Sequence, residues 1–134
     1  MNDTTRNPDP TTWSEKRLDH CRRALSEEQA VSLAATEQWA HVDRAKAHAD
    51  WASLYARIAE IIGDAAPASD RAQALVHEHY LIASRFYVPS RLAYVGMSLF
   101  YAENDDMRDF HNQFHPRMVR YLGAAIPEYA QRTL

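Results

Sequence analysis

Apolar residues recur along much of this chain at the three- and four-residue spacing of an α-helix. The clearest run lies between residues 51 and 62, where six apolar positions fall on one helical face: Trp51, Leu54, Tyr55, Ile58, Ile61 and Ile62. Gly63 follows this run at once, in the position where a glycine often caps a helix end. Since no proline or glycine interrupts residues 27–62, the segment predicts either one long helix or two helices that break near residues 46–50.

A shorter apolar stripe predicts a first helix over residues 13–25, with Trp13, Leu18, Cys21 and Leu25 on one side. The sequence Ser26-Glu27-Glu28-Gln29 then has the spacing of a capping box, so a new helix is expected to begin there. Residues 1–12 are rich in threonine, proline and aspartate and are expected to form a disordered tail. The predicted division is therefore a tail over residues 1–12 and a single α-helical domain over residues 13–134.

The second half of the chain predicts four further helices, over about 70–86, 90–102 and 105–114 and from Pro116 to near the end. Ser69 or Asp70 can cap the first of them, and Asp105-Asp106 can cap the short third one. A hinge is expected at Tyr87-Val88-Pro89, because a residue before proline is pushed out of helical geometry. The helix over 90–102 is apolar nearly all round, which predicts the buried centre of a bundle.

The composition supports an all-α class and a single-domain helical bundle. Only three glycines among 134 residues leave few turns, while alanine, the best helix former, is abundant. No stretch approaches the ~18 apolar residues that a membrane span requires, so no membrane contact is expected. A net charge of −3 gives little attraction for phosphate groups, so the chain alone is not expected to bind nucleic acid.

The single cysteine, Cys21, excludes an internal disulfide and fits a reducing compartment. The first residues lack the basic-then-apolar pattern of a secretory signal, so a cytoplasmic location is expected. Cys21 lies toward the end of its predicted helix, where the helix dipole disfavours a thiolate. A structural role is therefore expected for this cysteine rather than a reactive one.

Aromatic side chains in the second half are candidate ligand contacts, since small-molecule pockets are mostly apolar and often lie between bundle helices. Four tyrosines are spaced seven apart, from Tyr80 to Tyr101, and at least two of them are expected to line a cleft. The apolar stripe over 51–62 would form the opposite wall, with Tyr55, Tyr94, Met97 and Tyr101 as the floor and His79 and Tyr87 near the rim. The predicted ligand-binding residues are Trp51, Tyr55, His79, Tyr87, Tyr94, Met97 and Tyr101. The alternative is that these side chains simply pack in an ordinary core.

The histidines leave a second function class open. His111 and His115 are four residues apart, a spacing that lets two imidazoles share one metal ion, and His48 or His79 could add a third ligand. This pattern would make the protein a metal-dependent helical-bundle enzyme. The motif contains no glutamate that could act as a general base, and Pro116 follows it directly. Solvated or partly buried histidines are therefore the favoured interpretation, and no metal or cofactor is expected.

The order of elements from Pro67 to Ala130 resembles the TipAS-type antibiotic-recognition domain. The family pattern His-x6-Phe/Tyr-Tyr is similar to His79 through Tyr87, and its Tyr-x-x-Asp is similar to Tyr101 with Asn104 or Asp105. Its terminal Leu-x-x-Ala-Ile is similar to the segment from Leu122 to Ile126. The resemblance covers residues 65–130 well and residues 37–64 loosely.

This resemblance implies a small globin-like helical fold without haem, which binds bulky, rather apolar antibiotics such as thiopeptides or albicidin between its helices. In the family the domain is the drug-sensing half of MerR-type regulators. The DNA-binding part is missing here, and the start at Met1 favours a stand-alone, non-enzymatic binder, expected to be a monomer, for sensing or sequestration. Some relatives trap ligands through a cysteine of the central helix. Gly96-Met97-Ser98 stands in that helix, so covalent capture is not expected. A protein-interaction module, whose apparent pocket is only core, is the third hypothesis.

Overall fold

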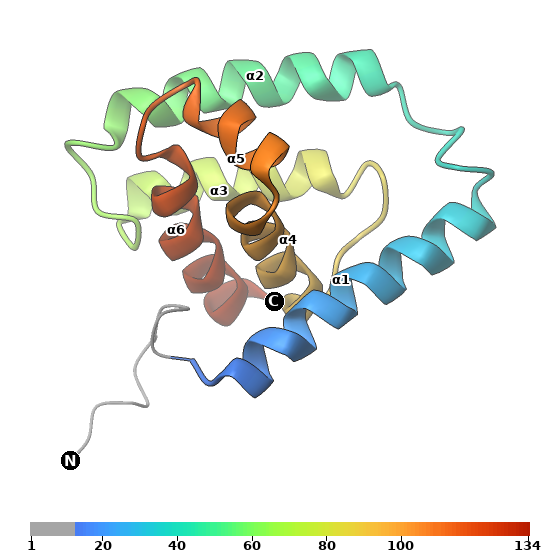
Figure 1. The fold of residues 1–134 in the computed structure, drawn as a ribbon. Coiled ribbons are helices and arrows are strands. Elements are labelled where there is room, and N and C mark those ends of the chain that lie inside the picture. The colour runs from blue at the N-terminus through green and yellow to red at the C-terminus, as the bar shows by residue number, and fades with distance from the viewer. Residues whose placement is uncertain (1–12) are drawn as a thin grey trace.

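The computed structural model describes residues 13–134, which fold into helices without any strand. The helices are α1 (Glu15–Ala35), α2 (Arg44–Ile61), α3 (Asp70–Ala83), α4 (Arg91–Glu103), α5 (Asp105–Asn112) and α6 (Met118–Thr133). Helix α4 packs against α1, α5 and α6, while α3 packs against both α2 and α6 (Figure 1). The all-α class expected from the sequence is confirmed. The tail expected over residues 1–12 lies outside the described residues.

Side-chain caps determine where most of these helices begin. In five helices the side-chain oxygen of the residue before the helix accepts a hydrogen bond from a backbone N–H of the first turn. These N-cap residues are Ser14, Asp43, Ser69, Ser90 and Asn104. The expected cap at Ser69 is therefore confirmed. Asn104, and not the Asp105-Asp106 pair, caps α5, and the two aspartates occupy its first turn, where the helix dipole favours negative charge.

The first helix differs from its prediction. Helix α1 runs unbroken from Glu15 to Ala35, so the new helix expected at Ser26 is wrong. The capping-box spacing falls inside a run of helix formers, where the backbone hydrogen bonds of α1 outcompete a side-chain cap. The break in the segment 27–62 lies at residues 36–43, between Thr36 and Asp43, and not near residues 46–50.

The turn between α1 and α2 uses an uncommon backbone geometry. Glu37, Gln38 and Trp39 are all left-handed, with φ of 52°, 63° and 61°. Such a conformation costs about 1–2 kcal/mol for each residue that is not glycine. Besides backbone hydrogen bonds, Trp39 makes two bonds that hold the turn: its amide donates to Thr36 Oγ1 (3.0 Å), and its indole Nε1 donates to Ser32 Oγ (2.9 Å). The strained turn therefore directs the Trp39 ring toward the body of the domain.

The turn after α2 needs no such geometry. Gly63 directly follows Ile62, the C-cap of α2, which is the position expected for it, and no glycine in residues 13–134 adopts a left-handed φ. The amides of Asp64 and Ala65 both donate to the carbonyl oxygen of Ile61, at 2.9 and 2.8 Å, and complete the turn. The hinge expected at Tyr87-Val88-Pro89 is confirmed, because these residues lie between α3 and α4 outside any helix.

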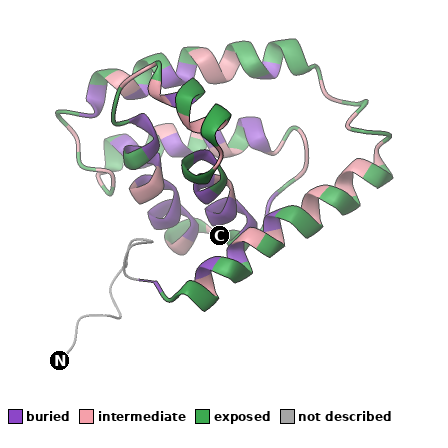
Figure 2. Cartoon of the chain, viewed as in Figure 1, coloured by how far each residue is buried: buried purple, intermediate pink, exposed green. Residues whose placement is uncertain are grey.

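Helix α4 is the buried centre that its sequence predicts (Figure 2). Helix α1 lies directly on it, and Leu18, Cys21 and Leu25 are buried along the contact. The backbones approach so closely that a Cβ atom built on Gly96 would lie 2.3 Å from the carbonyl oxygen of Cys21. Only glycine at position 96 permits this approach.

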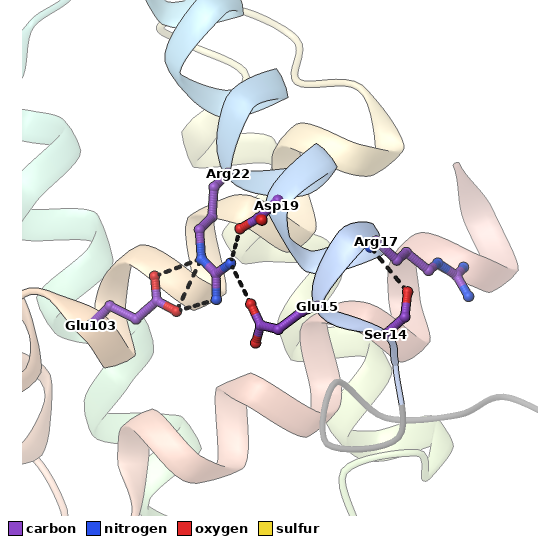
Figure 3. Close-up of polar contacts among 6 residues, drawn as sticks. All are labelled: Ser14, Glu15, Arg17, Asp19, Arg22 and Glu103. Atoms are coloured by element: carbon purple, nitrogen blue, oxygen red, sulfur yellow. Dashed lines mark hydrogen bonds and ion pairs between the residues drawn. The ribbon is translucent and has the colours of Figure 1, made fainter.

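Polar contacts attach α1 to both ends of α4. The Arg22 guanidinium donates to the Glu103 carboxylate at 2.7–3.1 Å and also to Asp19 and Glu15 of its own helix (Figure 3). These carboxylates raise the pKa of Arg22, the largest contribution coming from Glu103. At the other end, Glu28 accepts hydrogen bonds from the hydroxyl (2.5 Å) and amide (3.1 Å) of Ser90. Helix α1 is thereby positioned as one wall of the cavity described below.

Candidate ligand-binding site

A cavity of about 230 Å³ lies between α1, α2, α3, α4 and α5, beside the hinge that follows α3. Its walls are Leu25 and Gln29 of α1, Trp39 of the strained turn, His48 and Trp51 of α2, Ala83, Phe86 and Tyr87 around the hinge, Met97, Phe100 and Tyr101 of α4, and Met107 of α5. None of these side chains is a lysine, arginine, aspartate or glutamate. The cavity therefore suits an uncharged, largely apolar guest.

Three aromatic rings form a rigid wall of this cavity. The Phe86 ring lies between two tryptophans, edge-on to Trp39 at 5.2 Å and parallel to Trp51 at 5.7 Å with an interplanar angle of 8°. His48, three residues earlier in α2, stacks on Trp51 with a distance of 6.4 Å between ring centroids. His41 ties the same turn to the end of α3, since its Nε2 lies 3.1 Å from the carbonyl oxygens of both Arg85 and Phe86. The ring positions are thus set by contacts on several sides.

The structure brings four of the seven expected ligand-binding residues to the cavity, namely Trp51, Tyr87, Met97 and Tyr101. Tyr55, His79 and Tyr94 lie behind it in the core, 2%, 0% and 0% exposed. The expected placement of His79 at the rim is wrong, as is the placement of Tyr55 and Tyr94 on the floor. These three polar groups find partners within the protein, so they need no contact with solvent or ligand.

The buried polar groups form one connected network of hydrogen bonds. His111 Nδ1 lies 2.7 Å from the Met107 carbonyl oxygen, which can only accept, so this nitrogen carries the proton. Nε2 of neutral His111 then accepts from the Tyr55 hydroxyl at 2.8 Å. His79 Nε2 lies 3.2 Å from the Tyr55 oxygen and 3.3 Å from the Tyr101 oxygen. His79 Nδ1 lies 2.8 Å from the Tyr94 hydroxyl, which is also 3.4 Å from the Val76 carbonyl oxygen.

Burial keeps the histidines and tyrosines of this network neutral near pH 7. Desolvation, aided by the nearby His111, lowers the pKa of His79 to about 3, and desolvation also lowers the pKa of His111. Desolvation raises the pKa of Tyr55 and Tyr94 well above the usual value of a tyrosine. The network thus acts as a fixed polar core. It reaches the cavity through Tyr101 and Met107, which belong both to the network and to the cavity wall.

Two buried polar atoms at the cavity have no hydrogen-bond partner in the protein: Trp51 Nε1 and the Tyr87 hydroxyl oxygen. A buried donor without a partner costs about 1–3 kcal/mol in a folded protein. Burial, with a contribution from the Glu28 carboxylate, raises the pKa of Tyr87 to about 12, so its hydroxyl keeps the proton. Both atoms therefore keep a hydrogen-bond donor that no protein group uses.

The structure does not assemble the alternative metal site. Both ring nitrogens of His111 are engaged within the core, and His115 Nδ1 accepts from the Arg117 amide at 3.0 Å. Across residues 13–134 no three histidine, cysteine, aspartate or glutamate side chains are grouped so that they could hold a metal ion. Cys21 is fully buried, and burial raises the pKa of its thiol, in agreement with the structural role expected for it.

A larger hollow of about 490 Å³ lies between the α2–α3 turn and the start of α6. Its walls include backbone of the turn, the charged side chains Asp64, Arg117 and Arg120, and one aromatic ring, Tyr121. The Tyr121 hydroxyl already donates to the carbonyl oxygen of Ala65 at 2.7 Å. This hollow is polar where the smaller cavity is aromatic, so it is the weaker candidate for an apolar guest.

An uncharged, largely aromatic cavity between helices is the kind of site that small-molecule-binding domains use. The family model of the TipAS antibiotic-recognition domain matches residues 15–129, and the chain belongs to this family. The expected family is therefore confirmed, and the match extends further toward the N-terminus than the resemblance over residues 37–130. No curated protein and no solved structure gave a significant match. In the described chain no helix has the length and apolarity to cross a membrane.

The sequence did not point to several walls of the cavity. Leu25 was expected on the apolar side of the first helix, with no link to a cavity, and Gln29 was expected at the start of a separate helix. Trp39 lies in the turn that was not foreseen. Phe86 directly precedes the hinge expected at Tyr87-Val88-Pro89, and this position is the sequence feature that could have selected it; Met107 carries no such signal.

Proposed function

We propose that this chain binds bulky, rather apolar antibiotic-like molecules, such as thiopeptides or albicidin, without catalysing a reaction. The binding site is the aromatic cavity formed by helices α1 to α5. The uncharged cavity walled by Trp39, Trp51 and Phe86 is the observation that carries the proposal. Membership of an antibiotic-recognition family supports it. Aromatic walls offer broad flat surfaces for apolar rings, which is how most small-molecule pockets gain affinity.

The cavity volume suggests how such a ligand enters. At about 230 Å³ the cavity is smaller than the ~300–1,000 Å³ of pockets that enclose a drug-sized molecule. A single ring system of the ligand would therefore enter, while the remainder lies across the mouth, where Phe100 is 43% exposed. Met97 and Met107 can adjust their rotamers to ring systems of different shape.

The proposed binding is non-covalent and serves sensing or sequestration. Helix α4 presents Met97 to the cavity, and Cys21 is buried where α1 meets α4. We propose that the chain acts in the cytoplasm as a monomer, without contact to a membrane or to nucleic acid by itself. The net charge of −3 supports the absence of DNA contacts. A relation to MerR-type transcription regulation or to antibiotic resistance belongs to the same proposal.

A thermal-shift panel tests this proposal. It should contain thiopeptides, albicidin-like compounds and other multi-ring apolar drugs at ~100 µM. A ligand present at 100 times its Kd stabilises the folded state by about 2.7 kcal/mol, which is readily measured. Two exposed residues of α4 give a matched pair, since Phe100 lines the cavity and Leu92 does not.

The Phe100→Ala change should weaken binding of the best compound by about tenfold or more, the loss typical of an aromatic anchor. The Leu92→Ala change should leave its affinity unchanged. Absence of a shift with every compound would contradict the proposal and leave the protein-interaction hypothesis in place. Equal effects of the two changes would show that binding occurs away from the cavity.

A further inference from the structure

We infer that Trp51 Nε1 and the Tyr87 hydroxyl are the polar anchors of the cavity, and that they select an uncharged aromatic ring system bearing hydrogen-bond acceptors. The inference rests on the proposed function and adds the chemistry of the ligand segment that enters. It begins from the two unpartnered atoms described above, whose side chains belong to different elements and both line the cavity.

The missing partner of Tyr87 is an exception among the tyrosines of the described chain. Each of the other six hydroxyls lies within hydrogen-bond distance of a protein group: those of Tyr55, Tyr80, Tyr94, Tyr101, Tyr121 and Tyr129. The fold thus satisfies its buried tyrosines as proteins generally do. The one tyrosine that it leaves unsatisfied lies at the cavity.

Trp51 shows the same contrast with Trp39, the other tryptophan of the cavity wall. The Trp39 indole N–H has a partner inside the protein, Ser32 Oγ at 2.9 Å, whereas the Trp51 indole N–H has none. Parallel stacking on Phe86 fixes the plane of the Trp51 ring, so its N–H direction is set before a ligand arrives. A preorganised donor of this kind adds affinity without an ordering cost.

The chemistry of the two groups defines the complementary ligand. An indole N–H can only donate, and a tyrosine hydroxyl that keeps its proton can donate as well. The matching ligand atoms are acceptors, such as a ring nitrogen or an amide carbonyl oxygen. Glu28 lies near enough to Tyr87 to affect its ionisation, and no cation lines the cavity, so a carboxylate would be repelled. The acceptor is therefore an uncharged one.

Three bicyclic probes of nearly equal shape test this inference: naphthalene has no acceptor, quinoline has one ring nitrogen, and quinoxaline has two. Binding is followed by nuclear magnetic resonance of the indole N–H groups, which are assigned through tryptophan-to-phenylalanine variants. A cavity without polar anchors would prefer naphthalene, because the other two probes lose hydrogen bonds to water on entry. With the anchors, quinoline or quinoxaline should bind about tenfold more tightly than naphthalene.

The expected spectral result is a downfield shift of the Trp51 indole proton with the nitrogen-containing probes, and little change for Trp39. The Trp51→Phe and Tyr87→Phe variants should reduce the preference for nitrogen-containing probes and leave naphthalene binding nearly unchanged. Tyr121→Phe, which removes a partnered hydroxyl outside the cavity, is the matched control. The isosteric Tyr87→Phe change keeps the test decisive if Trp51→Phe disturbs the fold.

The outcomes separate this inference from the proposed function. A preference for naphthalene, or an unchanged preference in both anchor variants, overturns the role of the anchors while apolar binding in the cavity stands. Absence of binding by all three probes and by every compound of the antibiotic panel overturns both. Binding that shifts neither cavity tryptophan, Trp39 or Trp51, also overturns the inference, since the probe then lies elsewhere.

Discussion

A methyl group added at Gly96 probes the contact that places α1 on α4. The new Cβ atom would lie 2.3 Å from the carbonyl oxygen and 2.9 Å from the carbonyl carbon of Cys21, and 3.1 Å from Leu25 Cβ. Two of these atoms belong to the backbone of a helix and cannot rotate away. To reach the 3.4 Å of ordinary contact the two helices must separate by about 1 Å, in an interior that is close-packed.

The expected size of the effect follows from two opposing contributions. Overpacking of this kind destabilises by about 1–3 kcal/mol. The better helix propensity of alanine returns about 1 kcal/mol. We expect Gly96→Ala to lower the free energy of unfolding by up to about 2 kcal/mol, the difference between these two contributions. Because the displaced α1 carries Leu25 of the cavity wall, ligand affinity should fall as well.

Gly123 of α6 provides the matched control, because a Cβ atom added there meets no atom within 4 Å. Gly123→Ala should raise the free energy of unfolding by about 0.5–1 kcal/mol through helix propensity alone. Urea unfolding followed by circular dichroism measures both variants. A Gly96→Ala protein as stable as the Gly123→Ala protein would refute the close approach of α1 to α4.

Three further predictions concern the buried network and the strained turn. Tyr55→Phe should lower the free energy of unfolding by about 1–3 kcal/mol, because it leaves Nε2 of His111 without a donor; an unchanged urea midpoint would contradict the network. Burial lowers the pKa of His79 from 6.5 to about 3 in the folded state, so between these pH values the unfolded chain binds a proton that the folded chain does not. The stability should therefore be fully present above pH 6.5 and fall by about 1.4 kcal/mol per pH unit as the pH drops toward 3. Urea midpoints that do not fall between pH 7 and 4.5, or that fall equally in a folded His79→Gln variant, would argue against this pKa shift. Gln38→Gly should raise the free energy of unfolding by about 1 kcal/mol, because glycine relieves the left-handed φ of 63° at this position. The control Ala30→Gly, inside α1, should lower it by about as much. Melting temperatures that move in the same direction for both variants would contradict the strain.

Much of the fold could be predicted from the sequence because most helices carry strong local patterns. The apolar stripe from Trp51 to Ile62, the cap at Ser69 and the hinge before Pro89 each depend on neighbouring residues, and each is confirmed. The break between α1 and α2 could not be predicted in the same way. It contains neither glycine nor proline, and it places three residues with ordinary side chains in a left-handed conformation. Besides its local hydrogen bonds, the ring of Trp39 contacts Phe86 just beyond the end of α3, and such a contact has no local signature.

The cavity was predictable only in part for the same reason. The sequence pointed to Tyr87 at the hinge and to Met97 and Tyr101 in the apolar helix that follows, and these three residues do line the cavity. A histidine on an apolar helix face was expected near the rim, yet His79 is fully buried because tyrosines from α2 and α4 satisfy both of its ring nitrogens. Such partners lie 15 and 24 positions away in the chain, so only the fold shows them.

The structure of the protein bound to the tightest compound of the antibiotic panel tests the central claim most directly. The account predicts an aromatic segment of the ligand inside the cavity, in van der Waals contact with Trp51 and Met97, with the remainder of the molecule passing over Phe100. A ligand bound instead in the hollow beside Arg117 and Arg120, with the aromatic cavity unchanged, would contradict it.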